Sequence, residues 1–252
     1  MRLAIMSDIH GNLPALEAVL ADIAGRGPFD ALGVAGDLCE WGPRPREALA
    51  RVQGLGCPVV QGNTDRNVTI TAEARLRALG KSANSIKGLD WTRARLGATG
   101  TAYLADLPFA HTYPGPTDAA PGAARQDVLM VHANPRDMDT HLDPDAPPHE
   151  AESLLAGADA AVVAFGHLHT PYVRRVAGRL LVDVSSVGYP RDGDRRAAYA
   201  ILECDDDGDG GWRATIQRVP YDLEATAAAF RDSGIPHPEK RIRQLYHASY
   251  DK

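Results

Sequence analysis

The sequence predicts an α/β fold in which parallel strands alternate with helices. Short apolar runs such as Leu3 to Met6 and Ala160 to Phe165 are bounded by turn residues, which is typical of strands buried on both faces. An amphipathic pattern from Leu13 to Gly25 predicts a helix between the run at Leu3 to Met6 and the next apolar run, at Asp30 to Ala35. Strand, helix and strand in this order form a βαβ unit, so these strands are expected to run parallel.

Length and composition indicate one large domain, residues 1–252. Hydrophobic content of 44% and charged content of 24% match a soluble globular protein. The net charge of −6, from 27 basic and 33 acidic residues, argues against a broad nucleic-acid surface. No apolar run approaches the about 18 residues that span a bilayer. Three scattered cysteines suit a reducing cytosol, so we expect a cytoplasmic protein with no membrane partner.

The first half of the chain continues with two more strands, at Asp30–Ala35 and Pro58–Gln61, separated by a helix at Arg46–Leu55. Residues 68–107 then show helical spacing, which predicts two or three short helices with Trp91 and Leu96 facing inward. Because these helices follow the third strand directly, we expect them to border the site; helices that only cover the sheet are the alternative.

The second half is expected to be richer in strands. Strands are predicted at 108–113, 127–131, 160–165, 172–176, 180–184, 197–202 and 212–219, and helices at 151–155 and 223–230. Loops are expected at 114–124 and 134–148. The acidic loop Asp205–Gly211 is interpreted as a solvated hairpin tip rather than a calcium site. The tail from Pro236 shows no pattern that we can assign.

Polar residues follow the apolar runs where each expected strand ends. Asp8 and His10 follow the first strand, and the next two strands end in G-D and G-N-T-D. Each residue alone could be a helix cap or turn former. Three such endings in a row make that reading improbable, because the carboxyl ends of parallel strands share one edge of a sheet, where α/β proteins bind ligands.

The set of candidate metal ligands grows in the second half of the chain. The candidates are Asp8, His10, Asp37, Asn63, His132, His167 and His169. Seven N/O ligands are too many for one tetrahedral ion and suit two first-row transition ions. Because none of these candidate ligands is a cysteine, a structural zinc site or an Fe–S cluster is not expected. The other histidines are interpreted as packed or surface residues: His111, His141, His149, His237 and His247.

The ordered motifs D-I-H-G, G-D, G-N-T-D, V-H-A and G-H-L-H resemble the calcineurin-like metallophosphoesterase superfamily. The stretches S-D-I-H-G-N-L-P-A-L-E-A-V-L and S-S-V-G-Y-P-R-D-G-D are similar to a branch of small prokaryotic phosphodiesterase-like proteins. The similarity runs from Met1 to about Asp222. It implies a four-layer αββα sandwich of two mixed β-sheets flanked by helices, with a dinuclear metal centre at one edge.

The resemblance also implies roles for individual residues. Asp8, His10 and His169 would hold the first ion, Asn63, His132 and His167 the second, and Asp37 would bridge them. Asp65 would steady a ligand histidine, as carboxylates beside metal sites commonly do. The implied catalytic residues are Asp37, Asn63, Asp65 and His132. Manganese is the first expected metal, with iron, zinc, nickel and cobalt as alternatives.

One position departs from the family pattern. Many relatives have histidine where this chain has Thr64, and that histidine is thought to contact substrate and assist the leaving group. Threonine cannot act as a general acid near neutral pH. Asn63, Thr64, Arg66 and Arg191 are the candidate substrate contacts. Arg can grip phosphate through two hydrogen bonds, although a surface salt bridge is an equal alternative for each arginine.

The expected function is hydrolysis of a small phosphodiester or phosphomonoester by a hydroxide that bridges two divalent ions. The expected partner is therefore a small phosphorylated substrate, with nucleic acid expected only as a small nucleotide. A nuclease of the same superfamily is the enzymatic alternative, and a non-catalytic scaffold on this fold is the other. The sequence leaves open whether the chain forms a homo-oligomer.

Overall fold

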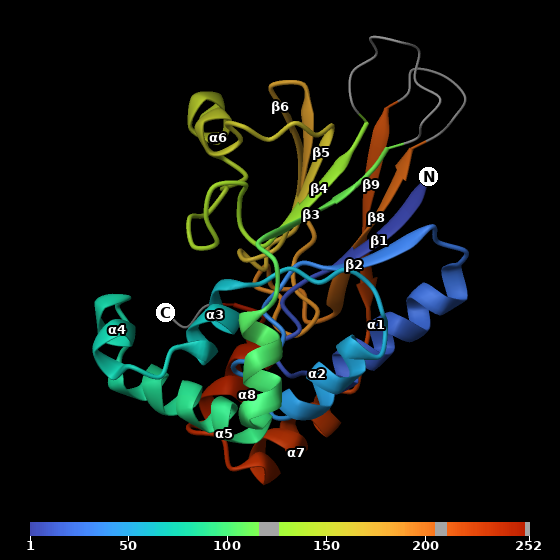
Figure 1. Ribbon diagram of the computed structural model, residues 1–252. Coiled ribbons are helices and arrows are strands. Elements are labelled where there is room, and N and C mark those ends of the chain that lie inside the picture. Colours follow the sequence, from blue (N-terminus) through green and yellow to red (C-terminus); the bar gives the residue numbers. More distant parts are fainter. Residues whose placement is uncertain (116–125, 205–210, 250–252) are drawn as a thin grey trace.

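The computed structural model describes residues 1–115, 126–204 and 211–249. The loops expected at 114–124 and at Asp205–Gly211 lie largely outside these residues. Eight helices are described: α1 (Leu13–Arg26), α2 (Pro45–Gln53), α3 (Asn63–Thr69), α4 (Glu73–Ala78), α5 (Ala83–Ala105), α6 (Pro148–Leu154), α7 (Leu223–Ser233) and α8 (Pro238–His247) (Figure 1).

The described strands form two mixed sheets. The first has the order β2 (Ala31–Val34), β1 (Arg2–Met6), β8 (Ala197–Cys204), β9 (Trp212–Val219). The second has the order β3 (Ala110–Tyr113), β4 (Val128–Val131), β5 (Val162–Phe165), β7 (Arg179–Asp183), β6 (Tyr172–Val176). β1 and β2 are parallel, as the βαβ pattern predicts, and so are β4, β5 and β7.

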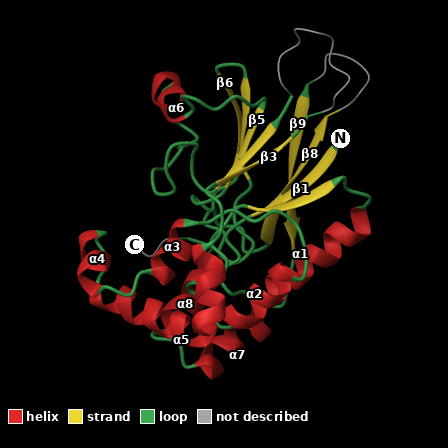
Figure 2. Ribbon diagram, viewed as in Figure 1, coloured by secondary structure: helices red, strands yellow, loops and turns green. Residues whose placement is uncertain are grey.

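The alternation of side chains along β1 explains how the layers stack. Leu3 and Ile5 face a core between the two sheets, which they share with Met130 of β4. Ala4 and Met6 point the other way and pack with helices α1, α2 and α5. The outer face of the second sheet packs against α6, and Figure 2 shows α6 beside that sheet, apart from the other helices. The four-layer αββα arrangement is thus confirmed.

Local signals explain several boundaries. The Asn12 side chain caps α1 by accepting the N–H of Ala15, and Pro14 occupies the first turn. The turn between β6 and β7 places Ala177 and Gly178 at positive φ, the geometry of a tight hairpin. Among the described residues, no helix combines the length and apolar character needed to cross a membrane.

The structure corrects two expectations of the sequence and adds a helix in a segment to which we assigned none. Residues 58–61 do not form a strand: they meet β2 in a single bridge at Val59, because Pro58 has no N–H and the Gln61 N–H donates to Pro108 instead. Trp91 is only half-buried, although Leu96 is buried. The tail from Pro236, to which we assigned no element, contains the helix α8, with Pro238 in its first turn and Ile242 and Leu245 buried.

Candidate metal centre

The predicted ligands lie on loops at one end of the two sheets. Asp8 and His10 follow β1, Asp37 follows β2, His132 follows β4, and His167 and His169 follow β5; Asn63 opens α3. Two groups have ligand atoms within 4.8 Å of one another. The first is Asp8, His10 and His169, and the second is Asp8, Asp37 and His132. All of these side chains are buried.

The first group is tight. Asp8 Oδ1 lies 3.0 Å from His169 Nε2 and 3.6 Å from His10 Nε2. The two histidine Nε2 atoms lie 3.2 Å apart. Two nitrogen lone pairs and a carboxylate oxygen therefore point at a common volume, the donor arrangement that a divalent cation would join.

Asp37 belongs to the second group and also faces a histidine of the first. Its Oδ2 is 3.7 Å from His10 Nε2, and its Oδ1 is 3.5 Å from His132 Nε2. Oδ1 also accepts the backbone N–H of Thr64. Asn63 extends the second group, because its Oδ1 lies 3.2 Å from His132 Nε2. The two oxygens of Asp37 thus face different histidines, as a bridging carboxylate would.

His167 lies next to the second group but is oriented differently from the other histidines. Its ring centroid is 5.0 Å from that of His132, and its backbone N–H donates to Asp8 Oδ2 at 2.9 Å. Its Nε2, however, lies 3.0 Å from the carbonyl oxygen of Asp139. The structure therefore brings His167 to the site without directing its Nε2 at the other ligand atoms.

Backbone carbonyls orient the three remaining histidines. The Nδ1 atoms of His10, His132 and His169 lie 2.5 to 2.9 Å from the carbonyl oxygens of Glu40, Ala35 and Tyr189. A carbonyl can only accept, so each Nδ1 carries the proton and donates it. This leaves each Nε2 lone pair pointing into the site, the tautomer that a metal ligand needs.

Backbone conformation is unusual throughout the centre. Five candidate ligands have positive φ: Asp8, His10, Asp37, His167 and His169, between 48° and 72°. Such values are uncommon outside glycine and tend to concentrate at functional sites. Two glycines admit the carboxylates. A Cβ on Gly166 would overlap Asp8 Oδ2, and one on Gly62 would overlap Asp37 Oδ1.

The surroundings shift the pKa values of three candidate ligands towards the protonation states that metals require, and that of His132 the other way. Burial opposes the ionised form of Asp8, but His169 and His10 outweigh it and hold the Asp8 pKa well below its usual range. Burial lowers the pKa of His10, and burial together with His132 lowers that of His167 to about 4. Burial also opposes the charged form of His132, yet Asp37 and Asp8 raise its pKa. Protons and metals therefore compete at His132.

Asp65 differs from its expected role beside a histidine. Its Oδ2 accepts the backbone N–H groups of Asp37 and Gly62, and its Oδ1 accepts that of Leu38. Burial, together with the nearby Asp37, raises the pKa of Asp65 to about 7. Asp65 orders the loop that carries Asp37, while backbone carbonyls take over the orienting of the histidines.

We expect Asp65→Asn to destabilise the protein by about 1–3 kcal/mol, the usual effect of leaving a buried donor unsatisfied. The amide offers only one accepting atom, so its NH2 group would face at least one of the three backbone N–H groups. Urea unfolding of the metal-free protein measures this loss. An unchanged midpoint and slope would contradict the role assigned to Asp65.

The candidate substrate contacts are less accessible than the sequence suggests. Thr64 is 2% exposed, and its Oγ1 has no hydrogen-bond partner among the described residues. Arg66 forms a two-pronged ion pair with Asp139, at 2.8 and 2.9 Å. Arg191 is 9% exposed and donates from Nη1 to the Ser249 carbonyl. Both arginine side chains therefore already form hydrogen bonds with other residues of the protein.

Sequence reasoning missed two residues of the site. Trp41 stacks on His10 with ring centroids 4.5 Å apart and planes 14° apart. Asp139 holds Arg66 through its carboxylate and faces His167 through its carbonyl. The only sequence signal for Trp41 is an aromatic residue close after G-D, and Asp139 lies in a segment without any period.

The residues present suit divalent cations. The donors are carboxylate, imidazole and amide, which bind first-row ions. Asp8 Oδ1 is buried and has no hydrogen-bond partner among the described residues, although the Nε2 atoms of two histidines lie nearby. A buried carboxylate oxygen in this state is what a cation would satisfy. Asp8, His10, Asp37, His132 and His169 therefore form a candidate site for divalent metal.

Comparison with known proteins agrees with the fold and the motifs. The family described as the calcineurin-like phosphoesterase superfamily domain matches residues 1–207. An alignment of 245 positions with an uncharacterized protein of Methanocaldococcus jannaschii, MJ0912, shows 29% identity. This alignment covers 88% of this chain and 88% of that protein. A metallophosphoesterase structure from Sphaerobacter thermophilus is 30% identical, with a TM-score of 0.75, over 98% of this chain and 100% of that one.

The structure of hypothetical protein PH1004 from Pyrococcus horikoshii shares the fold, with a TM-score of 0.81 at 20% identity over 99% of both chains. The family match covers most of the chain and includes all five residues of the buried Asp/His centre. This chain belongs to the calcineurin-like phosphoesterase superfamily.

Proposed function

We propose that this protein is a divalent-metal-dependent phosphoesterase that hydrolyses small phosphodiesters or phosphomonoesters. The observation that carries the proposal is the pair of adjoining buried ligand groups, whose histidines Asp37 faces through its two carboxylate oxygens. Asp8, His10 and His169 are proposed for one ion, Asn63, His132 and His167 for the other, and manganese as the metal.

Bound divalent ions would supply an activated water and neutralise charge on the phosphoryl group. The chain's own residues prepare the site for this chemistry. The backbone carbonyls hold three imidazoles in one tautomer, so no reorganisation of these rings is needed when substrate arrives. Asn63, which is half-buried beside His132, carries an amide N–H able to donate to a phosphoryl oxygen.

Three further proposals concern Arg66, the helices at 68–107 and the cellular location of the protein. Arg66 is proposed to act on substrate indirectly, by fixing Asp139 beside His167. The helices at 68–107 are proposed to border the substrate path. The three cysteines are free, two of them buried, which supports a reducing compartment and a cytoplasmic location.

The proposal is tested by adding manganese to metal-free protein and measuring hydrolysis of phosphomonoesters, cyclic nucleotides, dinucleotides and a single-stranded oligonucleotide. We expect turnover of small esters that is abolished by chelator and restored by metal. Turnover of the oligonucleotide alone would favour a nuclease. No turnover of any ester with two metals bound would point to a scaffold and contradict the proposal.

The replacement of the family histidine by Thr64 predicts a strong dependence on the leaving group. General acid help is worth about 10²–10⁴-fold, and threonine cannot give it. Nitrophenyl esters should therefore be preferred over alkyl phosphates, with rates rising steeply as leaving-group pKa falls. Thr64→His should flatten that slope, provided the imidazole reaches the leaving oxygen. The measurement is a rate series over substituted aryl esters.

A flat slope in the wild type, with chemistry shown to be rate-limiting, would mean that another acid acts. His141 is the first candidate, because its ring lies 4.8 Å from that of His167 and is exposed. His141→Ala should then restore a steep slope. His149, an exposed histidine on α6, provides the matched control.

A further inference from the structure

A cationic cavity of about 530 Å³ adjoins the candidate metal centre. It lies between the start of α5, the loop that carries Trp41, and α8. Four of its lining residues are cations: Arg191, Lys240, Arg241 and Arg243. No acidic side chain lines it among the described residues, and most of the rest of the wall is polar but uncharged. In a chain with a net charge of −6, this concentration of positive charge is local.

Two residues join the cavity to the metal centre. Trp41 lines the cavity and stacks on His10. Arg191 lines it too, and its backbone N–H donates to the His169 carbonyl at 2.8 Å. The Arg241 guanidinium lies over the Trp41 ring, 5.3 Å from the centroid. The Trp41 indole therefore contacts both His10 and the Arg241 guanidinium of α8.

One acidic residue interacts with a cation of the cavity without lining the cavity. Glu40 interacts electrostatically with Lys81 and Arg241, but it is buried and does not line the cavity. Arg243 is exposed on α8. Side chains that keep contact with solvent pay little desolvation when an anion arrives, and converging guanidinium groups are well suited to phosphate.

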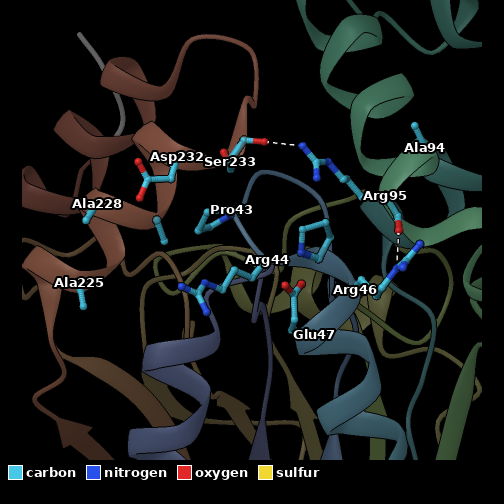
Figure 3. Close-up of a pocket in the computed structure, with 12 residues that line it drawn as sticks. Pro43, Arg44, Arg46, Glu47, Ala94, Arg95, Ala225, Ala228, Asp232 and Ser233 are labelled. Carbon is cyan, nitrogen blue, oxygen red and sulfur yellow. Dashed lines mark hydrogen bonds between the residues drawn. The ribbon is translucent and has the colours of Figure 1, made fainter.

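A cavity of about 860 Å³ elsewhere in the protein shows the contrast (Figure 3). It lies between α2, α5 and α7, and none of the candidate metal ligands lines it. Its wall mixes arginines with Glu47 and Asp232. Arg46 donates to the Arg95 carbonyl, and Arg95 donates to the Ser233 carbonyl. Two of its three arginines thus donate to backbone carbonyls, and its charge is mixed.

We propose that the cationic cavity binds a second phosphate group of the substrate, while the scissile ester lies at the metal centre. The preferred substrates are then small esters that carry two separated phosphate groups. This inference rests on the proposed phosphoesterase function and narrows its substrate class. Three of its four cations lie on α8, which is beyond residue 207, where the family match ends.

The test compares two esters with the same leaving group: the 5′-nitrophenyl phosphate of thymidine, with and without a 3′-phosphate. With manganese at low salt, we expect kcat/KM to be about 10-fold higher for the 3′-phosphorylated ester, equivalent to about 1.4 kcal/mol. The gain should appear in KM and should shrink as salt screens the charges.

Arginine variants locate the effect. Arg243→Gln and Arg241→Gln should each bring the ratio of the two kcat/KM values towards 1. Arg77→Gln removes the same charge from α4, where Arg77 pairs with Glu73 and does not line the cavity, and should keep the wild-type ratio. A ratio near 1 in the wild type, or one unchanged in both cavity variants, overturns the inference and leaves the phosphoesterase function standing.

A titration without metal separates the two claims. Inorganic pyrophosphate added to metal-free protein in a calorimeter should bind, with a dissociation constant about 10-fold higher for Arg243→Gln than for Arg77→Gln. If neither ester is hydrolysed with manganese, the proposed function fails, and this titration still decides whether the cavity takes phosphate groups. Absence of pyrophosphate binding, or equal binding by both variants, overturns the assignment of the cavity as a phosphate-binding site.

Discussion

Replacing Asp37 with asparagine should lower kcat/KM by more than about 100-fold. Loss of a residue that only hydrogen-bonds to a metal ligand typically costs about 10–100-fold. Asp37 faces both His10 and His132, so one substitution weakens both ligand groups. The metal-free protein should unfold at nearly the wild-type temperature, because the asparagine oxygen can still accept the Thr64 N–H. Initial rates with manganese and a thermal melt without metal measure the two effects.

Asp90→Asn is the matched control, since Asp90 is a surface residue of α5 paired with Arg93. It should change neither rate nor melting temperature appreciably, as exposed pairs contribute little. Wild-type turnover by Asp37→Asn at saturating manganese would remove Asp37 from the bridging role. A metal-free Asp37→Asn protein that is unfolded would show that Asp37 is needed for folding itself.

A single methyl group at Gly166 should also disable the site. The alanine Cβ would overlap Asp8 Oδ2 and the side chain of Ser7, so Asp8 must shift. A displacement of about 1 Å in a catalytic site can cost about 100-fold in rate, and overpacking a filled interior costs about 1–3 kcal/mol in stability. Steady-state kinetics and urea unfolding of Gly166→Ala measure both losses.

Gly25→Ala provides the control for this substitution. Gly25 is in α1, and no atom lies within 4 Å of the position its Cβ would take. Alanine there should raise stability by about 0.5–1 kcal/mol and leave the rate unchanged. If Gly166→Ala behaved like Gly25→Ala, the close approach of Gly166 to Asp8 would have no bearing on catalysis.

The sequence reveals the candidate ligands because their signals are local. Asp8 and Asp37 each follow an apolar run that ends abruptly in polar residues. The parallel pairing of β1 with β2 then brings both runs to one edge. Periodicity identifies the strands, and the topology follows from the helix between them, so the convergence of these residues needs no knowledge of long-range contacts.

The parts that sequence reasoning misses depend on partners far along the chain. Arg66 and Asp139 are separated by 73 residues, and neither segment indicates the other. Ile242 and Leu245 of α8 pack with Tyr189 and Phe230, so residues earlier in the chain determine where this helix lies. The role of Asp65 depends on three backbone N–H groups, whose positions exist only once the loop has folded.

The central claim is that this chain holds two divalent ions, one on either side of Asp37. A crystal structure of the manganese-loaded protein, with anomalous scattering recorded for manganese, tests it directly. We expect two anomalous peaks, one bonded to Asp8, His10 and His169 and one to Asn63, His132 and His167, at bonds of about 2.0–2.6 Å. A single peak, or peaks away from these side chains, would contradict the account.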